Sequence, residues 1–487
     1  MPIADAVLDV GGIDAGCALA QGAEATASRM LPVQRQAWTR LLTTLGCAGS
    51  SAGTVQLLVL GDSLLAGSGG GYAKLFAESL GKLCGASVTF SNLAQGGSPT
   101  ESVLPVLPSL LAEEADDSGM STLLLMDHSI NDSTFGDAKR VKAAVESELR
   151  WLLTARPRTA LLLVESWWGS ISPRASTHLM EAYAVAAHYG VAHVRFERAV
   201  RAERYEQAWG ANCRPRQFDA RCSVHPSWPT HELLMVVVNR SFAALAQSLC
   251  PGGRCPNAGA FAARPAQSDQ QFELPHATSS PALLRELSVC TTPSRSYLAS
   301  RRVDEKLEAP RVSKGNWTLY EDRQGKPGWV STEAGSVIEF DLAFGSRPSV
   351  AVSYLLSHDS TFGEVLVRMT NVQPSKSTAE AVWTRSNRMH MWNFNRMRLY
   401  GSRTDGIRAS TTSVVHLQAH QAIMQSHEME GVRHPVYGAE PYVWPDPRVL
   451  GIMGFGIPPH ATATMQIELC CPGSQSCKFK LIAITAC

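Results

Sequence analysis

Aliphatic runs alternate with amphipathic patterns along the chain from Val55 to about Leu249. This alternation predicts a parallel β-sheet with helices on its faces, because each parallel connection must cross the sheet. The expected strands are Val55–Leu60, Val88–Asn92, Ser121–Met126, Thr159–Glu165 and Gly190–Phe196. The expected helices are Gln34–Leu45, Gly71–Cys84, Ala138–Ala155, Ser176–Tyr189 and His231–Ser248. We therefore expect an α/β fold with three layers, α/β/α, in this part of the chain.

The pattern changes after Cys250, where about thirty residues are rich in Pro, Gly, Ala and Ser. Beyond Arg301 the expected strands are short and β-branched, which favours an antiparallel β-sandwich or jelly roll. They are Val337–Phe344, Ser349–Leu356, Glu364–Asn371, Ser413–His420, Ala463–Cys470 and Phe479–Thr485. At 487 residues the chain exceeds what one hydrophobic core usually serves. The predicted organisation is an N-terminal segment with a helix (1–50), an α/β domain (51–250), a linker (251–300) and a β-sandwich-like domain (301–487).

The overall composition is that of an ordinary globular protein. Hydrophobic residues make up 45% and charged residues 18%, and the formal net charge is +1. The chain therefore lacks the excess of positive charge that is typical of proteins that bind nucleic acid or an anionic membrane. No run of the chain approaches the roughly 18 to 20 apolar residues that a transmembrane helix requires. The expected partner is a small-molecule or glycan substrate, and the sequence does not determine the oligomeric state.

Twelve cysteines bear on the cellular compartment. No pair has the spacing of a zinc site, so disulfides in a lumenal or extracellular protein fit better than metal ligands. The first thirty residues lack a basic start and carry Asp5, Asp9 and Asp14, so they do not resemble a signal peptide. The sequence thus favours the secretory pathway or the cell exterior, and a cytoplasmic location stays open.

Three Asn-x-Ser/Thr triplets occur, at Asn131, Asn239 and Asn316. Only Asn316, in Gly315-Asn-Trp-Thr318, stands in a turn-like context.

Four short segments bear polar or glycine residues where chemistry usually occurs in a parallel sheet, at or near strand ends. The first strand leads into Gly-Asp-Ser63, and the second into a glycine-rich turn that contains Gly97. The third leads into Asp-His-Ser-Ile-Asn131-Asp, and His225 comes just before the last helix. A serine, a base and polar donors in one region are what acyl transfer needs.

These four blocks, in this order, resemble the SGNH hydrolase superfamily, also called GDSL-type esterases and lipases. The resemblance covers residues 54–249 and implies a flavodoxin-like α/β fold with a parallel sheet. It also implies that Ser63 is the nucleophile and His225 the base. The oxyanion hole would be formed by Ser63, Gly97 and Asn131. No metal or organic cofactor is implied, and the C-terminal region resembles no family.

Two positions depart from the family pattern. Ser129 stands where the third block usually has glycine, and Cys222 stands where the last block has the aspartate that orients the base. Replacing such an acceptor with an amide in a serine protease costs about 10⁴ in kcat, so its loss slows the reaction without abolishing it. Three outcomes stay open: a Ser–His dyad with a backbone acceptor, Asp219 as acceptor, or a disabled site. Cys222 could instead pair with Cys213 in a disulfide.

Other residues close to these blocks have expected roles in substrate contact or support. Trp167 and Trp168 follow the fourth strand and could stack on a sugar or shape an acyl pocket, and His128 could line the site. Asp62 is expected to organise the serine turn, and His231 to cap or pack the last helix.

The predicted function is a serine esterase that cleaves or transfers a short acyl ester, such as O-acetyl on a carbohydrate, through an acyl-enzyme. Hydrolysis and transfer share this intermediate, so the residues do not separate them. The alternative, favoured by Cys222 and the long β-region, is a catalytically degenerate domain that binds carbohydrate or protein.

Overall fold

The computed structural model describes most of the chain and leaves several segments undescribed. The described residues are 23–46, 52–66, 70–112, 120–135, 138–166, 183–196, 228–251, 273–287, 295–298, 309–321, 327–345, 348–357, 361–373, 396–400, 411–418, 460–471 and 477–487. They form two compact units. The first comprises residues 1–104, 113–288 and 324–326, and the second comprises 105–112, 289–323 and 327–487.

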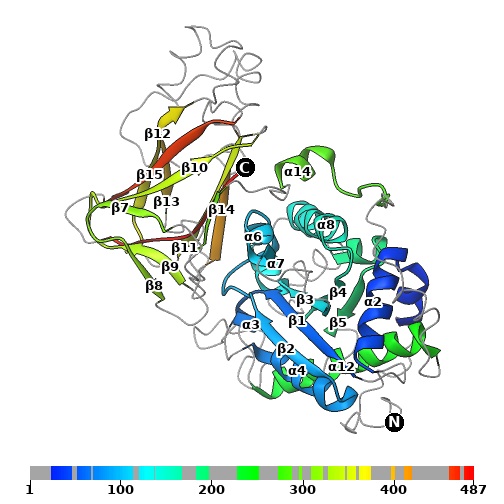
Figure 1. The fold of residues 1–487 in the computed structure, drawn as a ribbon. Coiled ribbons are helices and arrows are strands. Elements are labelled where there is room, and N and C mark those ends of the chain that lie inside the picture. Colours follow the sequence, from blue (N-terminus) through cyan, green and yellow to red (C-terminus); the bar gives the residue numbers. More distant parts are fainter. Residues whose placement is uncertain are drawn as a thin grey trace, which may run out of the picture. The chain divides into compact units, whose positions relative to one another are not determined.

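The first unit is built on a parallel sheet of five described strands in the order β2-β1-β3-β4-β5 (Figure 1). Their bounds are β1 Thr54–Gly61, β2 Ser87–Asn92, β3 Ser121–Asp127, β4 Ala160–Glu165 and β5 Ala192–Arg195. All neighbouring pairs are parallel. β1 and β3 are buried over almost their whole length, as expected of strands with helices on both faces. The predicted α/β fold class is confirmed.

Four long helices flank this sheet. They are α2 Pro32–Thr44, α4 Gly71–Cys84, α8 Ala138–Ala155 and α12 Trp228–Leu249. In the view of Figure 1, α8 lies above the sheet and α4 and α12 lie below it. α12 packs against α4 and α2 on one side, while α8 packs against α14 (Pro281–Glu286) and α5 (Thr100–Val103). The helices therefore provide the outer layers of an α/β/α arrangement.

Residues 251–300, predicted to be a linker, contain a short helix and a short strand within their described part. α14 packs on α8, and β6 (Arg295–Leu298) pairs with β16 (Phe479–Ala486) of the second unit. The Pro- and Ser-rich composition concealed both elements because each is short. Ser280 also caps α14: its side chain accepts a hydrogen bond from the Leu283 N–H, as expected of a serine before a proline-led helix.

Glu146 on α8 anchors the segment that precedes α14. Its buried carboxylate accepts hydrogen bonds from the Thr278 N–H (2.7 Å), the Ser279 N–H (2.7 Å) and the Tyr189 hydroxyl (2.7 Å). Burial raises the pKa of Glu146, but these hydrogen bonds outweigh it and hold the pKa below its ordinary value. The charged carboxylate is therefore the form that stabilises this segment.

Replacing Glu146 with Gln is expected to lower the free energy of unfolding by about 2 kcal/mol at pH 7, because charge-assisted hydrogen bonds are lost. Because the pKa of Glu146 is lower in the folded protein than in the unfolded chain, its carboxylate stabilises the fold fully at pH values above the unfolded pKa. This contribution is lost as the pH falls through the folded pKa. The difference in melting temperature between wild type and Glu146→Gln should therefore shrink below about pH 4.5. Glu78→Gln, at an exposed site on α4, is the control. A difference that does not vary with pH would contradict this role for Glu146.

The described part of the second unit contains two antiparallel sheets (Figure 1). One has the order β13-β12-β15-β10-β7, and the other has the order β14-β11-β16-β9-β8, with β6 also paired to β16. The bounds not yet given are β7 Arg311–Lys314, β8 Thr318–Glu321, β9 Pro327–Ser331, β10 Val337–Ala343, β11 Ser349–Leu356, β12 Glu364–Gln373, β13 Arg396–Tyr400, β14 Thr411–Gln418 and β15 Thr462–Cys470. The predicted antiparallel β-region is therefore present.

Side chains from both sheets share one hydrophobic core. Phe340 of β10 contacts the rings of Tyr297 (5.1 Å between ring centroids) and Trp329 (5.6 Å), and Phe479 of β16 stacks on Tyr354 (5.5 Å). Two tryptophans of this unit, Trp317 and Trp329, are buried in this core, with exposed fractions of 4% and 8%. Their packing supports the sandwich and leaves neither of them free to stack on a ligand. α6 (Leu107–Ala112) belongs to the same unit, with Val106 against Ala483.

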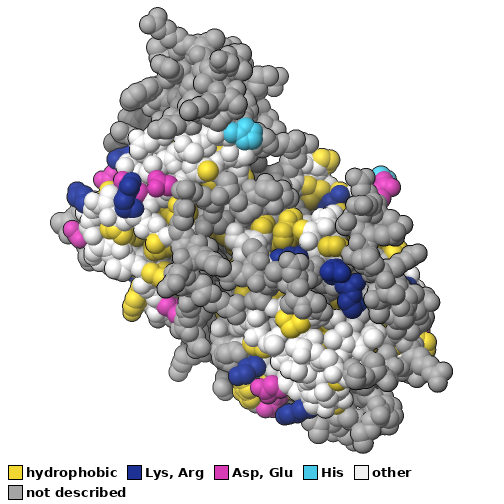
Figure 2. Space-filling view, viewed as in Figure 1, with side chains coloured by type: hydrophobic (Ala, Val, Ile, Leu, Met, Phe, Trp, Pro, Cys, Tyr) yellow, Lys and Arg dark blue, Asp and Glu magenta, His cyan; other side chains and the backbone are white. Residues whose placement is uncertain are grey.

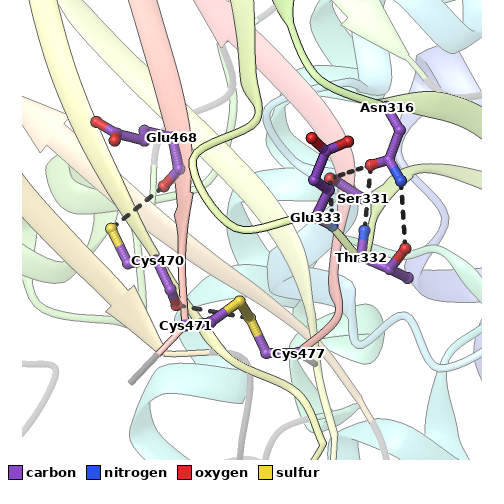
Figure 3. Close-up of a disulfide and its surroundings, with 8 residues drawn as sticks. All are labelled: Asn316, Ser331, Thr332, Glu333, Glu468, Cys470, Cys471 and Cys477. Atoms are coloured by element: carbon purple, nitrogen blue, oxygen red, sulfur yellow. Dashed lines mark hydrogen bonds between the residues drawn. A yellow bond between two sulfur atoms is a disulfide. The ribbon is translucent and has the colours of Figure 1, made fainter. Parts of the chain in front are cut away.

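Disulfides are present in the described part of the chain. Cys471 and Cys477 are bonded to each other (Figure 3). Cys250 takes part in a disulfide, and Cys487 takes part in a disulfide. Cys84 and Cys470 are thiols. Cys213 and Cys222, for which the sequence suggested a pairing, lie outside the described residues.

No helix among the described residues is both long and apolar enough to cross a membrane. On the face drawn in Figure 2, described Lys and Arg side chains lie interspersed with Asp and Glu side chains.

Candidate active site

The site is built where three neighbouring strands of the first unit end. β1 leads into Ser63, the first residue of α3 (Ser63–Ala66), and β2 leads into the turn that contains Gly97. β3 leads into α7 (Ser129–Phe135), which carries Asn131. Since β2, β1 and β3 are adjacent and parallel, their carboxyl ends lie at one edge of the sheet.

Asp62 joins the serine turn to the asparagine helix. Its Oδ1 accepts from the Leu64 N–H (3.0 Å), and its Oδ2 accepts from the Asn131 N–H (3.3 Å). Its own N–H donates to the Asp127 carbonyl (3.0 Å). The carboxylate therefore organises the turn, as the sequence predicted, and it also fixes the position of Asn131.

Gly61 allows β1 and β3 to approach closely just before Ser63. A Cβ at this position would lie 2.6 Å from the Asp127 carbonyl oxygen and 2.6 Å from a methyl group of Leu65. Because the first of these atoms is backbone, the clash could be relieved only by moving the strands apart. Any side chain at Gly61 would therefore displace the serine turn.

We expect Gly61→Ala to lower the free energy of unfolding by about 1 to 3 kcal/mol, as overpacking does, and to reduce whatever catalytic activity depends on Ser63. Chemical denaturation and turnover of an aryl acetate would measure the two effects. The matched control is Gly81→Ala within α4, where the nearest atom to an added Cβ is 3.3 Å away. Retention of full stability and activity by Gly61→Ala would contradict the close approach.

The turn after β2 is held against the end of β1. The Leu93 N–H donates to the Val59 carbonyl (2.8 Å), and the Gln95 N–H donates to the Gly61 carbonyl (2.9 Å). Gly97 follows with φ of 82°, in the left-handed region that favours glycine, and it is buried. The turn therefore holds the Gly97 backbone close to the residues that lead into Ser63.

Asn131 is 4% exposed. Its backbone N–H is bonded to Asp62, but within the described part of the chain its side-chain Nδ2 has no hydrogen-bond acceptor. A buried amide donor without an acceptor is costly, so such a group in a native site calls for an explanation. An oxyanion formed beside it would be a suitable acceptor.

The neighbouring Asp132 fixes α7 from its other side. Its carboxylate accepts from the Thr100 N–H (2.8 Å), the Thr100 hydroxyl (2.6 Å) and the Tyr183 hydroxyl (2.8 Å). Burial raises the pKa of Asp132 to about 6, although these hydrogen bonds favour the charged form. Asn131 is therefore held through its own N–H and through the next residue along the helix.

Asp127, whose backbone carbonyl accepts from the Asp62 N–H, provides a third buried carboxylate in the site. Asp127 accepts from the Tyr72 hydroxyl (2.7 Å) and the Ser129 hydroxyl (2.7 Å). Burial raises the pKa values of both Asp62 and Asp127, and the charge of Asp127 raises that of Asp62 further. The hydrogen bonds to each carboxylate act in the opposite direction. Ser129, at the position where the family has glycine, thus supports Asp127.

His128 is buried, with 1% of its surface exposed, and it joins the second and third blocks. Its Nδ1 lies 3.0 Å from the Ser98 carbonyl oxygen, next to Gly97. Burial lowers the pKa of His128 to about 4, so the ring is neutral at pH 7, and Nδ1 carries the proton because a carbonyl only accepts. Its Nε2 lies 4.0 Å from Glu148 Oε1 on α8, and burial raises the pKa of Glu148 to about 8.

His128→Leu is expected to lower kcat by up to about 100-fold with little change in KM, because the Gly97 turn loses its attachment to α7. His128→Asn, whose amide can still donate to Ser98, should recover most of this loss. Steady-state kinetics of all three proteins would separate kcat from KM. Equal losses in both variants would show that the hydrogen bond to Ser98 does not position the turn.

Several predicted site residues lie outside the described part of the chain: His225, Asp219, Trp167 and Trp168. Their roles stay predictions. His231 is described on α12; it is 6% exposed and packs against the rings of Tyr72 (6.4 Å) and Trp228 (5.7 Å). Within the described residues, no cluster of three or more His, Cys, Asp or Glu side chains could hold a metal ion.

Sequence reasoning missed Tyr72, Thr100 and Glu148, which support the site from α4, α5 and α8. Tyr72 and Asp127 are 55 positions apart, and Thr100 and Asp132 are 32 apart, so no local motif links them. The available signal was weak: Tyr72 and Glu148 lie on helices that were expected to flank the sheet, and Thr100 lies outside every expected helix and strand.

Comparisons with known proteins bear on the fold. No protein-family model and no curated protein matches the sequence. A solved two-domain esterase active on acetylated mannans, co-crystallised with mannopentaose, is 15% identical, with a TM-score of 0.50. The comparison covers 92% of this chain and 94% of that chain.

Other solved structures match only part of the chain. The psychrotrophic esterase EstA from Pseudoalteromonas sp., inhibited by monoethylphosphonate, is 18% identical, covering 38% of this chain and 93% of its own, with a TM-score of 0.29. A member of the lipolytic G-D-S-L family from Veillonella parvula is 14% identical, covering 38% of this chain and 96% of its own, with a TM-score of 0.29. The chain thus has a fold similar to that of the solved two-domain esterase, with the Ser63, Gly97 and Asn131 segments at the carboxyl edge of its parallel sheet.

Proposed function

We propose that this protein is a serine esterase of the SGNH type that removes or transfers a short acyl group through an acyl-enzyme. The observation that carries the proposal is the buried Asn131 amide donor, which has no acceptor among the described residues. Asp62 ties this asparagine to the turn that presents Ser63. Asp62 thus holds the turn of the nucleophile Ser63 and the unused amide donor of Asn131 in one arrangement. Such an arrangement suits the stabilisation of an oxyanion formed when the serine attacks an ester.

In the proposed reaction the Ser63 hydroxyl oxygen attacks the ester carbonyl and its proton passes to His225. The carbonyl oxygen becomes an oxyanion that accepts from the N–H groups of Ser63 and Gly97 and from Asn131 Nδ2. Collapse of this intermediate expels the alcohol, which takes the proton from His225, and leaves the acyl group on Ser63. Water, or a sugar hydroxyl, then attacks the acyl-enzyme by the same steps. Each oxyanion donor contributes about 3 to 4 kcal/mol in a known case.

The proposed substrate is a short acyl ester on a carbohydrate, with acetyl favoured. Support comes from the two-domain esterase of similar fold, which is active on acetylated mannans. The disulfide between Cys471 and Cys477 supports a lumenal or extracellular location, where such polymers occur.

Covalent labelling with a fluorophosphonate probe tests the proposal. Wild type should be labelled, whereas Ser63→Ala and His225→Ala should not, and turnover of an aryl acetate should follow the labelling. Ser133→Ala is the matched control, because its hydroxyl donates to the Ile130 carbonyl (2.8 Å) within α7. Folded wild type that is neither labelled nor active would refute the esterase and favour the alternative suggested by Cys222, a degenerate domain that binds glycan or protein.

Turnover of acetylated mannan, compared with a lipid ester and an aryl acetate, tests the substrate class. Release of acetate from the polymer at a higher kcat/KM than from the aryl ester would support the carbohydrate. A preference for the lipid ester would overturn it and leave the serine mechanism intact.

A further inference from the structure

The structure distinguishes the three Asn-x-Ser/Thr triplets of the chain by burial. Asn131 is 4% exposed in the candidate site, and Asn239 is 8% exposed on α12, where its Nδ2 donates to the Ser79 hydroxyl (2.9 Å). Asn316 is exposed, in the turn between β7 and β8. A bulky glycan on either buried asparagine would prevent the fold, so only Asn316 can carry one in the native protein.

The Asn316 amide is held by hydrogen bonds to Ser331 and Thr332 (Figure 3). Its Oδ1 accepts from the Ser331 hydroxyl (2.6 Å) and the Thr332 N–H (3.4 Å), and its Nδ2 donates to Thr332 Oγ1 (3.3 Å). An amide nitrogen carries two protons, and the bond to Thr332 uses one of them. The nitrogen therefore has a second proton that a sugar could replace.

The rest of the triplet is also suitably placed. Trp317 is 4% exposed and packs in the core of the second unit, so it anchors the turn. Thr318, whose hydroxyl completes the triplet, is exposed at the first position of β8. Gly315, with φ of 78°, turns the chain just before Asn316.

The surface around Asn316 has two features that favour aggregation and that a glycan would cover: edge strands and exposed apolar side chains. β7 and β8 are each the last strand in the order of the described strands of their sheets, and unpaired edge strands can template aggregation. Large apolar side chains are exposed on both: Val312 (43%) on β7, and Leu319 (45%) and Tyr320 (55%) on β8. A polar glycan on the connecting turn would shield both edges from other chains.

We propose that Asn316 is an N-glycosylation site whose glycan protects the β7 and β8 edges. The donor class is a lipid-linked oligosaccharide pyrophosphate: Nδ2 of Asn316 bonds to C1 of the first sugar, the lipid pyrophosphate leaves, and one amide proton is lost. The Cys471–Cys477 disulfide in the same unit is consistent with an oxidising compartment, where such transfer takes place. This inference does not depend on the proposed esterase activity.

The test is expression of the full chain behind a secretion signal in a eukaryotic cell. Peptide-N-glycosidase treatment in heavy-oxygen water should convert Asn316 to labelled aspartate, located by peptide mass spectrometry, in protein whose Cys471–Cys477 bond is mapped. Asn316→Gln and Thr318→Ala should each lose one glycan, Thr318→Ser should keep it, and Asn239→Gln should change nothing. Unmodified Asn316 in secreted, disulfide-bonded protein would overturn the site, as would a glycan on Asn131 or Asn239.

The protective role has its own measurement. Wild type deglycosylated after folding, and Thr318→Ala, should both aggregate faster in light-scattering assays than glycosylated wild type. Adding Leu319→Thr and Tyr320→Thr to Thr318→Ala should slow aggregation again by reducing the exposed apolar surface. Equal aggregation rates with and without the glycan would refute shielding.

Discussion

Replacing Asn131 with Ala is expected to lower kcat for an aryl acetate by about 10² to 10³-fold while KM changes little, because the lost donor acts on charge that develops in the transition state. The fold should survive, since the backbone N–H of residue 131 still donates to Asp62 and Asp132 still holds α7 to Thr100. The substitution also removes an amide that has no acceptor in the described structure, so the free energy of unfolding should not fall greatly. Steady-state kinetics and chemical denaturation measure the two quantities.

The matched control is Asn239→Ala, which removes a buried asparagine from α12 together with its bond to Ser79. Asn239→Ala should cost stability and leave kcat unchanged, the reverse of the pattern expected for Asn131→Ala. If Asn131→Ala retained full kcat in an enzyme that depends on Ser63, the third block would not supply an oxyanion donor. The assignment of Gly97 and the Ser63 N–H would then have to be tested separately.

Trp38→Ala is expected to lower the free energy of unfolding by about 3 to 5 kcal/mol, the cost of removing a large buried aromatic. Trp38 is fully buried on α2, and its ring lies 5.7 Å from that of Phe242 on α12. Its loss would leave a cavity between two helices and the sheet that they cover. Chemical denaturation followed by near-ultraviolet circular dichroism would report the change.

Two further substitutions calibrate this result. Trp38→Phe keeps most of the apolar volume and removes an indole N–H that has no acceptor in the described part of the chain, so its cost should be much smaller. Trp228→Ala removes a tryptophan that is 45% exposed and should also cost less. If Trp38→Ala and Trp228→Ala lowered the free energy of unfolding equally, burial of Trp38 between α2 and α12 would not make the large contribution to stability that is predicted here.

The long elements of the first unit followed from hydrophobic periodicity. α4 (Gly71–Cys84) and α8 (Ala138–Ala155) have the predicted bounds, and β1 and β3 extend their predictions by one or two residues. α12 begins at Trp228, before the predicted start at His231, because Pro229 is tolerated in the first turn of a helix. Short helices such as α7 escaped prediction because seven residues cannot display a hydrophobic face, and their stability comes from tertiary hydrogen bonds.

The sequence by itself determined the alternation of strands and helices, the antiparallel region that follows it, and the local motifs that contain Ser63, Gly97 and Asn131. Local patterns suffice there because periodicity and glycine backbone freedom act over a few residues. Only the tertiary structure decided that Asp62 bonds Asn131, that His128 bonds Ser98, and that Asn316 is exposed while Asn131 and Asn239 are buried. These outcomes depend on which strand ends meet and which helix faces are covered. Each is determined by contacts between residues that lie tens of positions apart in the sequence, so no local pattern reveals it.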